Sequence, residues 1–426
     1  MILKSSQQKM YKEMHMKKTL LTVLMSSSVI FLTACGSDDN DLVFNGPNNG
    51  IPVNNIQNPV VSTPIAYDKT NMTSVAGQSV VMTYKMLGVN GKEVQATSLV
   101  ITPKTPAPAK GWPIVVWAHG TTGVADQCAP SRNKLDVDIE GMITQLLDAG
   151  YVVVAPDYEG LGEPSGNELH PFLNLKSEAY SITDAVVAAR NYLGVKVSNQ
   201  WMAVGHSQGG HAALGAAQYA GRANLDYKGT VVVAPASNLD TIFDFGTQYA
   251  KTLPPADKIG IYASLNTYGA LIVAGMQSQP NPATYTQVFQ PEAAITAADA
   301  TTICAPPLGG KFAAEMNAVY LTNPSLTGYL TQTDFMKVPM VATFINKTAQ
   351  PLTVKVTTPI RIYQGQLDTT VPKVATDKLI ASARLNGTVI EDKNYQIGLW
   401  NHTTAYTGNI PNIVNDVKEM MPTPTP

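Results

Sequence analysis

Cysteine and histidine are scarce in this 426-residue chain, which has three cysteines and six histidines. They form no cluster at the spacing of zinc ligands, and the chain has no P-loop and no EF-hand loop, so we expect no metal and no cofactor. Charged residues make up only 14% of the chain and form no basic patch. The first 34 residues hold five lysines and one glutamate, so the rest has a formal charge of about −6, which argues against nucleic-acid binding.

The most informative segment is the pentapeptide GHSQG at residues 205–209. It lies between an apolar run at residues 201–204 and a helical stretch of small residues at 211–217. A G-x-S-x-G sequence at a strand-to-helix corner forces its serine into a strained turn, and glycines flank it because side chains there would collide with neighbouring elements. The pattern predicts Ser207 as a nucleophile.

A serine nucleophile needs a histidine to take its proton and a carboxylate to orient that histidine. In the α/β-hydrolase arrangement these residues follow the order serine, acid, histidine. Among the histidines only His402 lies far downstream of Ser207, so it is the predicted base. We expect it in a loop between a strand at 388–396 and a helix around 409–420.

The predicted acid is Asp368, in the turn that follows an apolar strand at residues 359–363. Asp377 and Asp392 also precede His402 in the chain. The first falls in a helical stretch and the second near a strand edge, so both are interpreted as solvated side chains.

Two backbone N–H groups are expected to stabilise the oxyanion. Gln208, the residue after the nucleophile, supplies one of them. The other should come from the loop after the strand at 112–118, from either Thr121 or Thr122. His119 in this loop is interpreted as a loop-orienting residue, and His206 and His211 as packing or lining residues.

Several separated segments carry a resemblance to a known family. They are HGTTG at 119–123, CAPS at 128–131, DYEGLG at 157–162, the serine motif with Gly210, and residues 364–372. With these segments the chain resembles the secreted lipases and esterases of the α/β-hydrolase fold, in particular the secretory lipases that include the yeast lipase A type. The resemblance implies an esterase or lipase that uses the predicted triad, with a helical insertion over the site. Where the yeast enzyme has an acidic residue in the oxyanion loop, this chain has Thr121 and Thr122.

Apolar strands alternate with helices along the chain, which predicts an α/β fold with a mostly parallel central sheet covered on both faces. Residues 239–351 are too many for a structureless connection, so they should fold as a mainly helical cap over the carboxyl ends of the strands. Several of their apolar side chains are candidates either for an acyl pocket or for the cap's own core. These are Phe243, Phe245, Tyr249, Tyr262, Tyr268, Leu271, Ile272 and Met276.

The N-terminus has the features of a bacterial lipoprotein signal. A basic start at residues 16–18 precedes an apolar run that is short for a membrane span, and a small residue precedes Cys35. Cys35 would be lipidated, and Gly36 after it favours the outer membrane by the usual sorting rule. The expected division is a signal peptide at 1–35, of which 1–15 is an upstream extension, a flexible tether at 36–60, the core at 61–238 and 352–426, and the cap at 239–351.

The other two cysteines, Cys128 and Cys304, lie beside the oxyanion loop and in the predicted cap. An exported compartment permits disulfides, so we predict that they pair, with two free buried thiols as the alternative. The leading hypothesis is an exported, monomeric serine hydrolase that cleaves a small-molecule ester or lipid. A serine peptidase or amidase of the same fold and a non-catalytic surface lipoprotein remain as alternatives.

Overall fold

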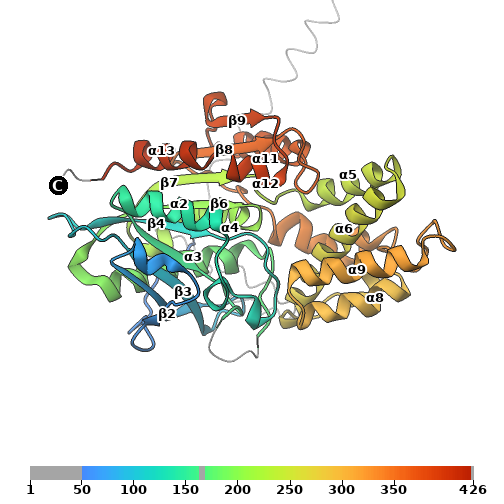
Figure 1. Ribbon diagram of the computed structural model, residues 1–426, viewed down its shortest axis with the longest axis horizontal. Helices are drawn as coiled ribbons and strands as arrows, with labels where there is room; N and C mark the ends of the chain where they lie inside the picture. Colours follow the sequence, from blue (N-terminus) through green and yellow to red (C-terminus); the bar gives the residue numbers. More distant parts are fainter. Residues whose placement is uncertain (1–49, 163–167, 424–426) are drawn as a thin grey trace, which may run out of the picture. The chain divides into compact units, whose positions relative to one another are not determined.

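A computed structural model describes residues 50–162 and 168–423, and within these ranges one nine-stranded sheet forms the centre of the fold (Figure 1). The strand order is β1-β2-β3-β5-β4-β6-β7-β8-β9. Pairing is antiparallel from β1 to β5 across the first edge and parallel from β5 to β9. The mostly parallel sheet that the sequence predicts is therefore confirmed. The strands are β1 Ile65–Ala66, β2 Gln78–Leu87, β3 Glu93–Thr102, β4 Trp112–Ala118, β5 Val152–Pro156, β6 Val197–His206, β7 Asp226–Val233, β8 Ile360–Gly365 and β9 Tyr395–Gly398.

Alternate residues of each central strand enter two different hydrophobic cores. In β4, Val115 and Trp117 belong to one core, whereas Ile114 and Val116 belong to the other. Because successive side chains of a strand point to opposite faces, a continuous apolar run requires helices on both faces. Figure 1 shows this layering. One face packs on α2 Val137–Asp148 and α13 Ile410–Met420, the other on α3 Leu175–Leu193 and α4 Gln208–Tyr219.

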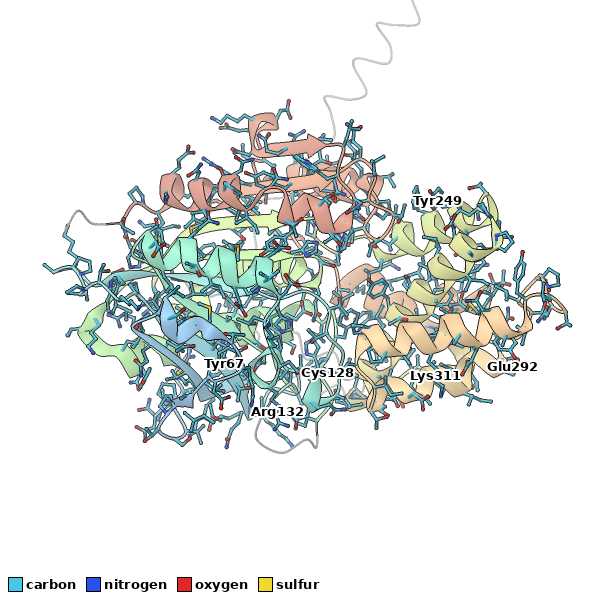
Figure 2. The ribbon with its side chains drawn as sticks, in the orientation of Figure 1. Tyr67, Cys128, Arg132, Tyr249, Glu292 and Lys311 are labelled. Carbon is cyan, nitrogen blue, oxygen red and sulfur yellow. A yellow bond between two sulfur atoms is a disulfide. The ribbon has the colours of Figure 1, made fainter. Side chains whose placement is uncertain are left out.

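A helical insertion separates β7 from β8 in the sequence. In Figure 1 its yellow and orange helices gather to the right of the sheet. The disulfide Cys128–Cys304 joins the loop after β4 to this insertion, which confirms the predicted pairing. Figure 2 labels Cys128 near this junction, with Tyr249, Glu292 and Lys311 on the helices of the insertion. The helices are α5 Leu239–Lys251, α6 Pro255–Gly275, α7 Tyr285–Val288, α8 Pro291–Ala298, α9 Ala305–Val319 and α10 Pro339–Thr343, followed by a π-helical turn at Phe344–Thr348.

Helix α6 with its continuation to Ser278 is the one described helix that is long and apolar enough to cross a membrane. Most of it is buried inside the protein. Its apolar residues, including Leu271 and Met276, belong to the main hydrophobic core, which accounts for its composition.

The C-terminal part differs from the sequence-based expectation. The expected strand at 388–396 is replaced by a four-residue β9, preceded by a 3-10 turn at Asp392–Asn394. Thr388 is buried, and its hydroxyl accepts a hydrogen bond from the amide of Val356 instead of facing a sheet neighbour. His402 is not in a loop but begins a short helix, α12 His402–Thr407, which Asn401 caps through the amide of Thr404.

The described residues begin at residue 50, inside the segment expected to be a flexible tether. Asn54 donates to Asp184 (2.8 Å) and its amide donates to the carbonyl of Arg222 (2.8 Å). Arg222 and Asp184 form a buried ion pair, and Arg222 also donates to the carbonyl of Pro52. The segment around residues 52–54 is thus held against the core, whereas the signal segment with Cys35 and residues 36–49 lie outside the described residues.

Candidate active site

Ser207 lies between β6 and α4 in a backbone conformation that non-glycine residues rarely adopt, with φ 59° and ψ −119°. Such strain persists only where surrounding structure enforces it. The amide of Ser207 donates to the carbonyl of Val233 (2.9 Å), and its own carbonyl accepts from His211 (3.1 Å). The turn therefore holds the serine at the carboxyl end of the parallel strands.

Two glycines make this turn sterically possible. A Cβ atom on Gly205 would lie 2.0 Å from the carbonyl oxygen of Gly209. A Cβ atom on Gly209 would lie 1.8 Å from the carbonyl oxygen of Ala118, at the end of β4. Real Cβ atoms do not approach so closely, so the strand-turn-helix packing requires glycine at both positions.

His402 contacts Asp368, as the sequence-based triad requires. Nδ1 of His402 lies 2.7 Å from Oδ2 of Asp368, whose side chain is fully buried, while the His402 side chain is 18% exposed. The other carboxylate oxygen accepts from the amides of Thr370 (2.9 Å) and Val371 (2.8 Å). The carboxylate is thus fixed by its own turn and directs its free edge at the imidazole.

The two other carboxylates that precede His402 lie elsewhere. Asp377 bonds Lys373 and Tyr395 on the surface, and Asp392 pairs with Arg384 with its own side chain 97% exposed. Neither has a contact with His402 in the structure as described. The geometry selects Asp368 as the partner of His402.

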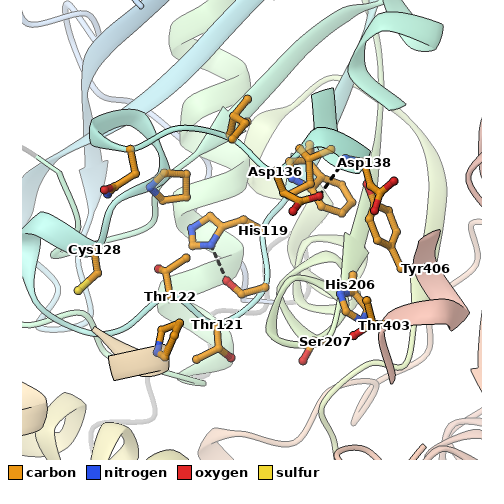
Figure 3. A pocket seen from close by; sticks show the side chains of 18 of the residues that line it. His119, Thr121, Thr122, Cys128, Asp136, Asp138, His206, Ser207, Thr403 and Tyr406 are labelled. Atoms are coloured by element: carbon orange, nitrogen blue, oxygen red, sulfur yellow. Dashed lines mark hydrogen bonds between the residues drawn. The ribbon is translucent and has the colours of Figure 1, made fainter. Parts of the chain in front are cut away.

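Ser207 and His402 line the same cleft, which has a volume of about 590 Å³. Figure 3 shows this cleft from close by and labels Ser207 in it. We call it the wide cleft. Thr121 and Thr122 also line it, from the loop after β4. A Cβ atom on Gly120 would lie 3.9 Å from Cβ of Ser207, so this loop passes directly beside the predicted nucleophile.

Thr121 and Thr122 differ in their position beside the nucleophile. Thr121 lines two cavities that Ser207 also lines, whereas Thr122 shares only the wide cleft with it. The carbonyl of Thr122 accepts from the amide of Ala305 in the insertion (2.8 Å). Thr121 is the better placed of the two predicted candidates for the second oxyanion donor.

These features agree with the comparisons with known proteins. A family model described as secretory lipase matches residues 131–418. The chain belongs to the secretory lipase family. A comparison with curated proteins finds no match.

Solved structures of lipases and esterases show the same α/β-hydrolase fold. Candida antarctica lipase A in its closed state is 18% identical, with a TM-score of 0.64 over 86% of this chain and 82% of that one. A ligand-bound form of the rice cell wall degrading esterase LipA from Xanthomonas oryzae is 20% identical, with a TM-score of 0.59 over 85% of this chain and 98% of that one. The predicted fold class is thereby confirmed.

In this secretory lipase family member, His206 lies beside His402 with the ring centroids 4.6 Å apart. Burial, together with the nearby His402, lowers the pKa of His206 to about 3. The ring is therefore neutral, and since a carbonyl can only accept, its Nε2–H donates to the carbonyl of His402 (3.0 Å). His206 lines the cleft, and it also holds the backbone of the predicted base.

His119 is buried at the start of the oxyanion loop. Its ring nitrogens contact the carbonyls of Gly120 (2.7 Å) and Asp157 (3.1 Å), and its ring stacks on Tyr158 with centroids 4.3 Å apart. Burial lowers the pKa of His119 to about 4. These contacts agree with the loop-orienting role that the sequence suggests.

A buried polar cluster behind the nucleophile was not identified from the sequence. The side-chain amide of Gln208 lies 2.7 Å from Nε2 of His170 and donates to Glu178 (2.8 Å). His211 contacts the other oxygen of Glu178 (2.5 Å) and the carbonyl of Ala349 (3.0 Å). The cluster fixes the side chain of the residue whose amide is the first predicted oxyanion donor.

Glu178 is ionised within this cluster. Burial raises its pKa, but the electrostatic contribution of His211 and hydrogen bonds with His170 and His211 outweigh burial and lower the pKa to about 2. Helix α3 carries several polar residues that are all buried, so the usual polar-outside periodicity gives no signal for them. Among the described residues, no group of three or more His, Cys, Asp or Glu side chains is arranged to hold a metal ion.

Proposed function

We propose that the protein is an exported serine hydrolase that cleaves carboxylic esters through Ser207, His402 and Asp368. The observation that carries the proposal is the 2.7 Å contact of His402 with the buried Asp368, in a cleft that His402 shares with the strained Ser207. Membership of the secretory lipase family supports both ester hydrolysis and export.

In the proposed reaction, Oγ of Ser207 attacks the ester carbonyl carbon while Nε2 of His402 takes its proton. Asp368 orients the ring through Nδ1 and stabilises the imidazolium that forms. The amides of Gln208 and Thr121 receive the developing oxyanion. Collapse of the tetrahedral intermediate breaks the carbon–oxygen bond of the leaving alcohol, which takes the proton from His402. Water then hydrolyses the acyl-enzyme by the same steps.

The insertion at residues 239–351 is proposed to act as the cap of this site. Its residue Tyr268 lines the wide cleft, and its residues Cys304 and Pro306 meet the rim. Of the eight candidate acyl-pocket side chains, Phe243, Tyr268 and Ile272 share a second cavity with Ser207. The cap thus contributes directly to the surfaces beside the nucleophile.

The deciding experiment uses the soluble form that starts after Cys35. Hydrolysis of p-nitrophenyl butyrate by Ser207→Ala should fall by at least about a thousandfold, because loss of a triad member removes most of the catalytic power. Ser264→Ala, at an exposed serine of α6 whose hydroxyl donates to Gly260, should retain full turnover. Absence of turnover and of labelling by a fluorophosphonate in the folded wild type would contradict the proposal, and p-nitroanilides test the amidase alternative.

The membrane anchor is a separate proposal from the sequence. Cys35 is proposed to be lipidated and to attach the protein to the outer membrane. Incorporation of labelled palmitate that disappears in Cys35→Ser tests the anchor, and unlabelled wild-type protein in the soluble fraction would argue against it.

A further inference from the structure

Two cavities of very different size meet at Ser207. The first is the wide cleft of about 590 Å³. The second, which we call the narrow pocket, has a volume of about 30 Å³ and is lined mainly by apolar side chains. Its walls include Phe172, Leu239, Phe243, Tyr268, Ile272 and Val371, drawn from the core and from the insertion. Thr121, Ser207 and Tyr268 line both cavities and form the boundary between them.

The chemistry of the proposed reaction assigns one half of the ester to each cavity. The leaving alcohol oxygen must receive its proton from His402, and among the residues described as lining the two cavities His402 appears only in the wide cleft. The carbonyl oxygen must point at the amides of Gln208 and Thr121, and both residues line the narrow pocket. The alcohol part therefore lies in the wide cleft and the acyl chain in the narrow pocket.

The volume of the narrow pocket limits the acyl chain. By the same measure, its volume of about 30 Å³ is a small fraction of the 590 Å³ of the wide cleft, so it suits a short alkyl group better than a fatty chain.

Phe243 is packed tightly against other side chains of the insertion. Its ring packs edge-on against Phe335 with centroids 5.1 Å apart. A Cβ atom on Gly269 would lie 3.9 Å from that ring and 3.0 Å from Phe289. Extending the pocket past Phe243 would require these rings to repack.

The wide cleft suits a bulky alcohol. Its inner walls include the apolar residues Leu135, Ile139 and Tyr406, and Lys134, Asp136 and Asp138 add charged groups to its lining (Figure 3 labels Asp136, Asp138 and Tyr406). Asp136 is held in place as the N-cap of α2, where it accepts from the amide of Asp138 (2.9 Å). An alcohol with an apolar body and polar groups at its edge matches this lining.

We infer that the substrates are esters of a short acyl group, of two to four carbons, with a bulky alcohol. This inference rests on the proposed function, since it uses the roles of Ser207 and His402. It separates this protein from hydrolases of long-chain fatty esters, because chain length would be set by Phe243 and its neighbours in the insertion.

The test of the acyl side compares kcat/KM of the soluble form on p-nitrophenyl esters from acetyl to decanoyl. We expect a maximum between acetyl and butyryl and a fall of about tenfold or more from butyryl to hexanoyl, the usual effect of a methylene or two that a pocket rejects. A maximum at octanoyl or decanoyl would overturn the inference while leaving ester hydrolysis intact. Hydrolysis of none of these esters would instead remove the proposed function.

Enlarging the pocket supplies the second measurement. Phe243→Ala should shift the maximum to hexanoyl or longer, and Ile272→Ala should act in the same direction if Phe243→Ala fails to fold. Phe344→Ala is the matched control, because Phe344 is a similarly buried phenylalanine of the insertion that lines neither the narrow pocket nor the wide cleft. An unchanged chain-length profile in folded Phe243→Ala and Ile272→Ala would overturn the assignment of the acyl chain to this pocket.

The alcohol side is tested with the acetyl group held constant. Ethyl acetate and 2-phenylethyl acetate release alcohols of similar acidity, so their comparison isolates binding in the wide cleft. We expect KM to be about tenfold lower or more for 2-phenylethyl acetate, as apolar contacts of a ring in a pocket provide. Equal KM values for the two esters would refute the role of the wide cleft.

Discussion

Ser207 and Asp368 differ in the backbone conformation that positions each of them in the candidate site. Ser207 is held in a strained positive-φ turn, whereas Asp368 lies in an unstrained turn whose amides satisfy one carboxylate oxygen. The second oxygen is then available to His402 alone. In the proposed mechanism, strain exposes the nucleophile Ser207, and hydrogen bonding fixes Asp368, the group that orients the base.

Replacing Asp368 by asparagine should lower kcat by about ten-thousandfold, since the neutral amide favours the wrong imidazole tautomer. The fold should survive, because the side-chain oxygen can still accept from Thr370 and Val371. Kinetics with p-nitrophenyl acetate and a melting curve measure both effects. Asp377→Asn is the matched control, and loss of activity there with retention in Asp368→Asn would reverse the assignment of the acid.

Asp157 should make stability depend on pH. Burial raises its pKa from 3.8 to about 6, against hydrogen bonds from Ser131 and Thr97 that lower it. The folded state therefore binds the proton more tightly than the unfolded state, and the resulting stabilisation is lost as pH rises from about 4 through 6. The shift corresponds to about 3 kcal/mol.

Chemical unfolding of wild type and Asp157→Asn between pH 4 and 7 measures this effect. The variant's stability relative to wild type should increase as the pH rises, and a difference that stays constant with pH would show that Asp157 is not the group responsible.

Helix α4 is the element on which the nucleophile depends. It starts at Gln208, directly after the serine, and Gly209 lets its first turn approach the end of β4. The same closeness brings the amide of Gln208 beside the oxyanion loop. The close approach of the β4 backbone to the N-terminus of α4 thus positions both the turn at Ser207 and the amide of Gln208, one of the predicted oxyanion donors.

Gly209→Ala should therefore destabilise the protein by about 3 kcal/mol and abolish turnover, because the added methyl meets the backbone of Ala118 and His119. Gly141→Ala is the control. Gly141 lies inside α2 with no atom within 4 Å of its would-be Cβ, so alanine should stabilise by about 0.5–1 kcal/mol. Denaturant unfolding of both variants tests the pair, and equal effects would contradict the packing argument.

The molecule as a whole consists of a sheet-based core and a helical insertion that share one site. The narrow pocket takes walls from both parts, Phe172 and Val371 from the core and Phe243 and Ile272 from the insertion. The Cys128–Cys304 disulfide covalently joins the two parts beside the rim. The size of the narrow pocket consequently depends on how the core and the insertion are held together.

Removing the disulfide should loosen this arrangement. With a sequence separation of 176 between the cysteines, the chain-entropy model gives a loss of about 5 kcal/mol for the double variant Cys128→Ala/Cys304→Ala. A lower melting midpoint of the double variant, and of the wild type after reduction, is the expected result. The reductant should not change the midpoint of the double variant, and an unchanged wild-type midpoint would show that the disulfide adds no stability.

The sequence alone predicted the parallel sheet, the disulfide and the candidate residues Ser207, Asp368 and His402. The structure confirms the mostly parallel sheet and the disulfide, and it brings His402 against Asp368, while the catalytic roles of the three residues stay predictions. The sheet follows from apolar runs that must be buried on both faces, and Ser207 from a glycine-flanked corner. His402 and Asp368 follow from their order along the chain, and the cysteine pair from the small number of cysteines. The same reasoning misplaced the last strand and put His402 in a loop, because Thr388 satisfies its hydrogen bonds with residues 354–356, which a local pattern does not reveal.

Only the tertiary structure showed three features of the site. They are the buried cluster around Glu178, the better placement of Thr121 than of Thr122, and the unequal volumes of the two cavities. The cluster joins the side chains of residues 170, 178, 208 and 211, whose polar character alone would place them at the surface, with the backbone carbonyl of Ala349. The volume of the narrow pocket is the small space left when side chains from six separate segments pack together. No short segment of the sequence predicts this volume, because it depends on the distances between elements of the fold rather than on the residues within any one element.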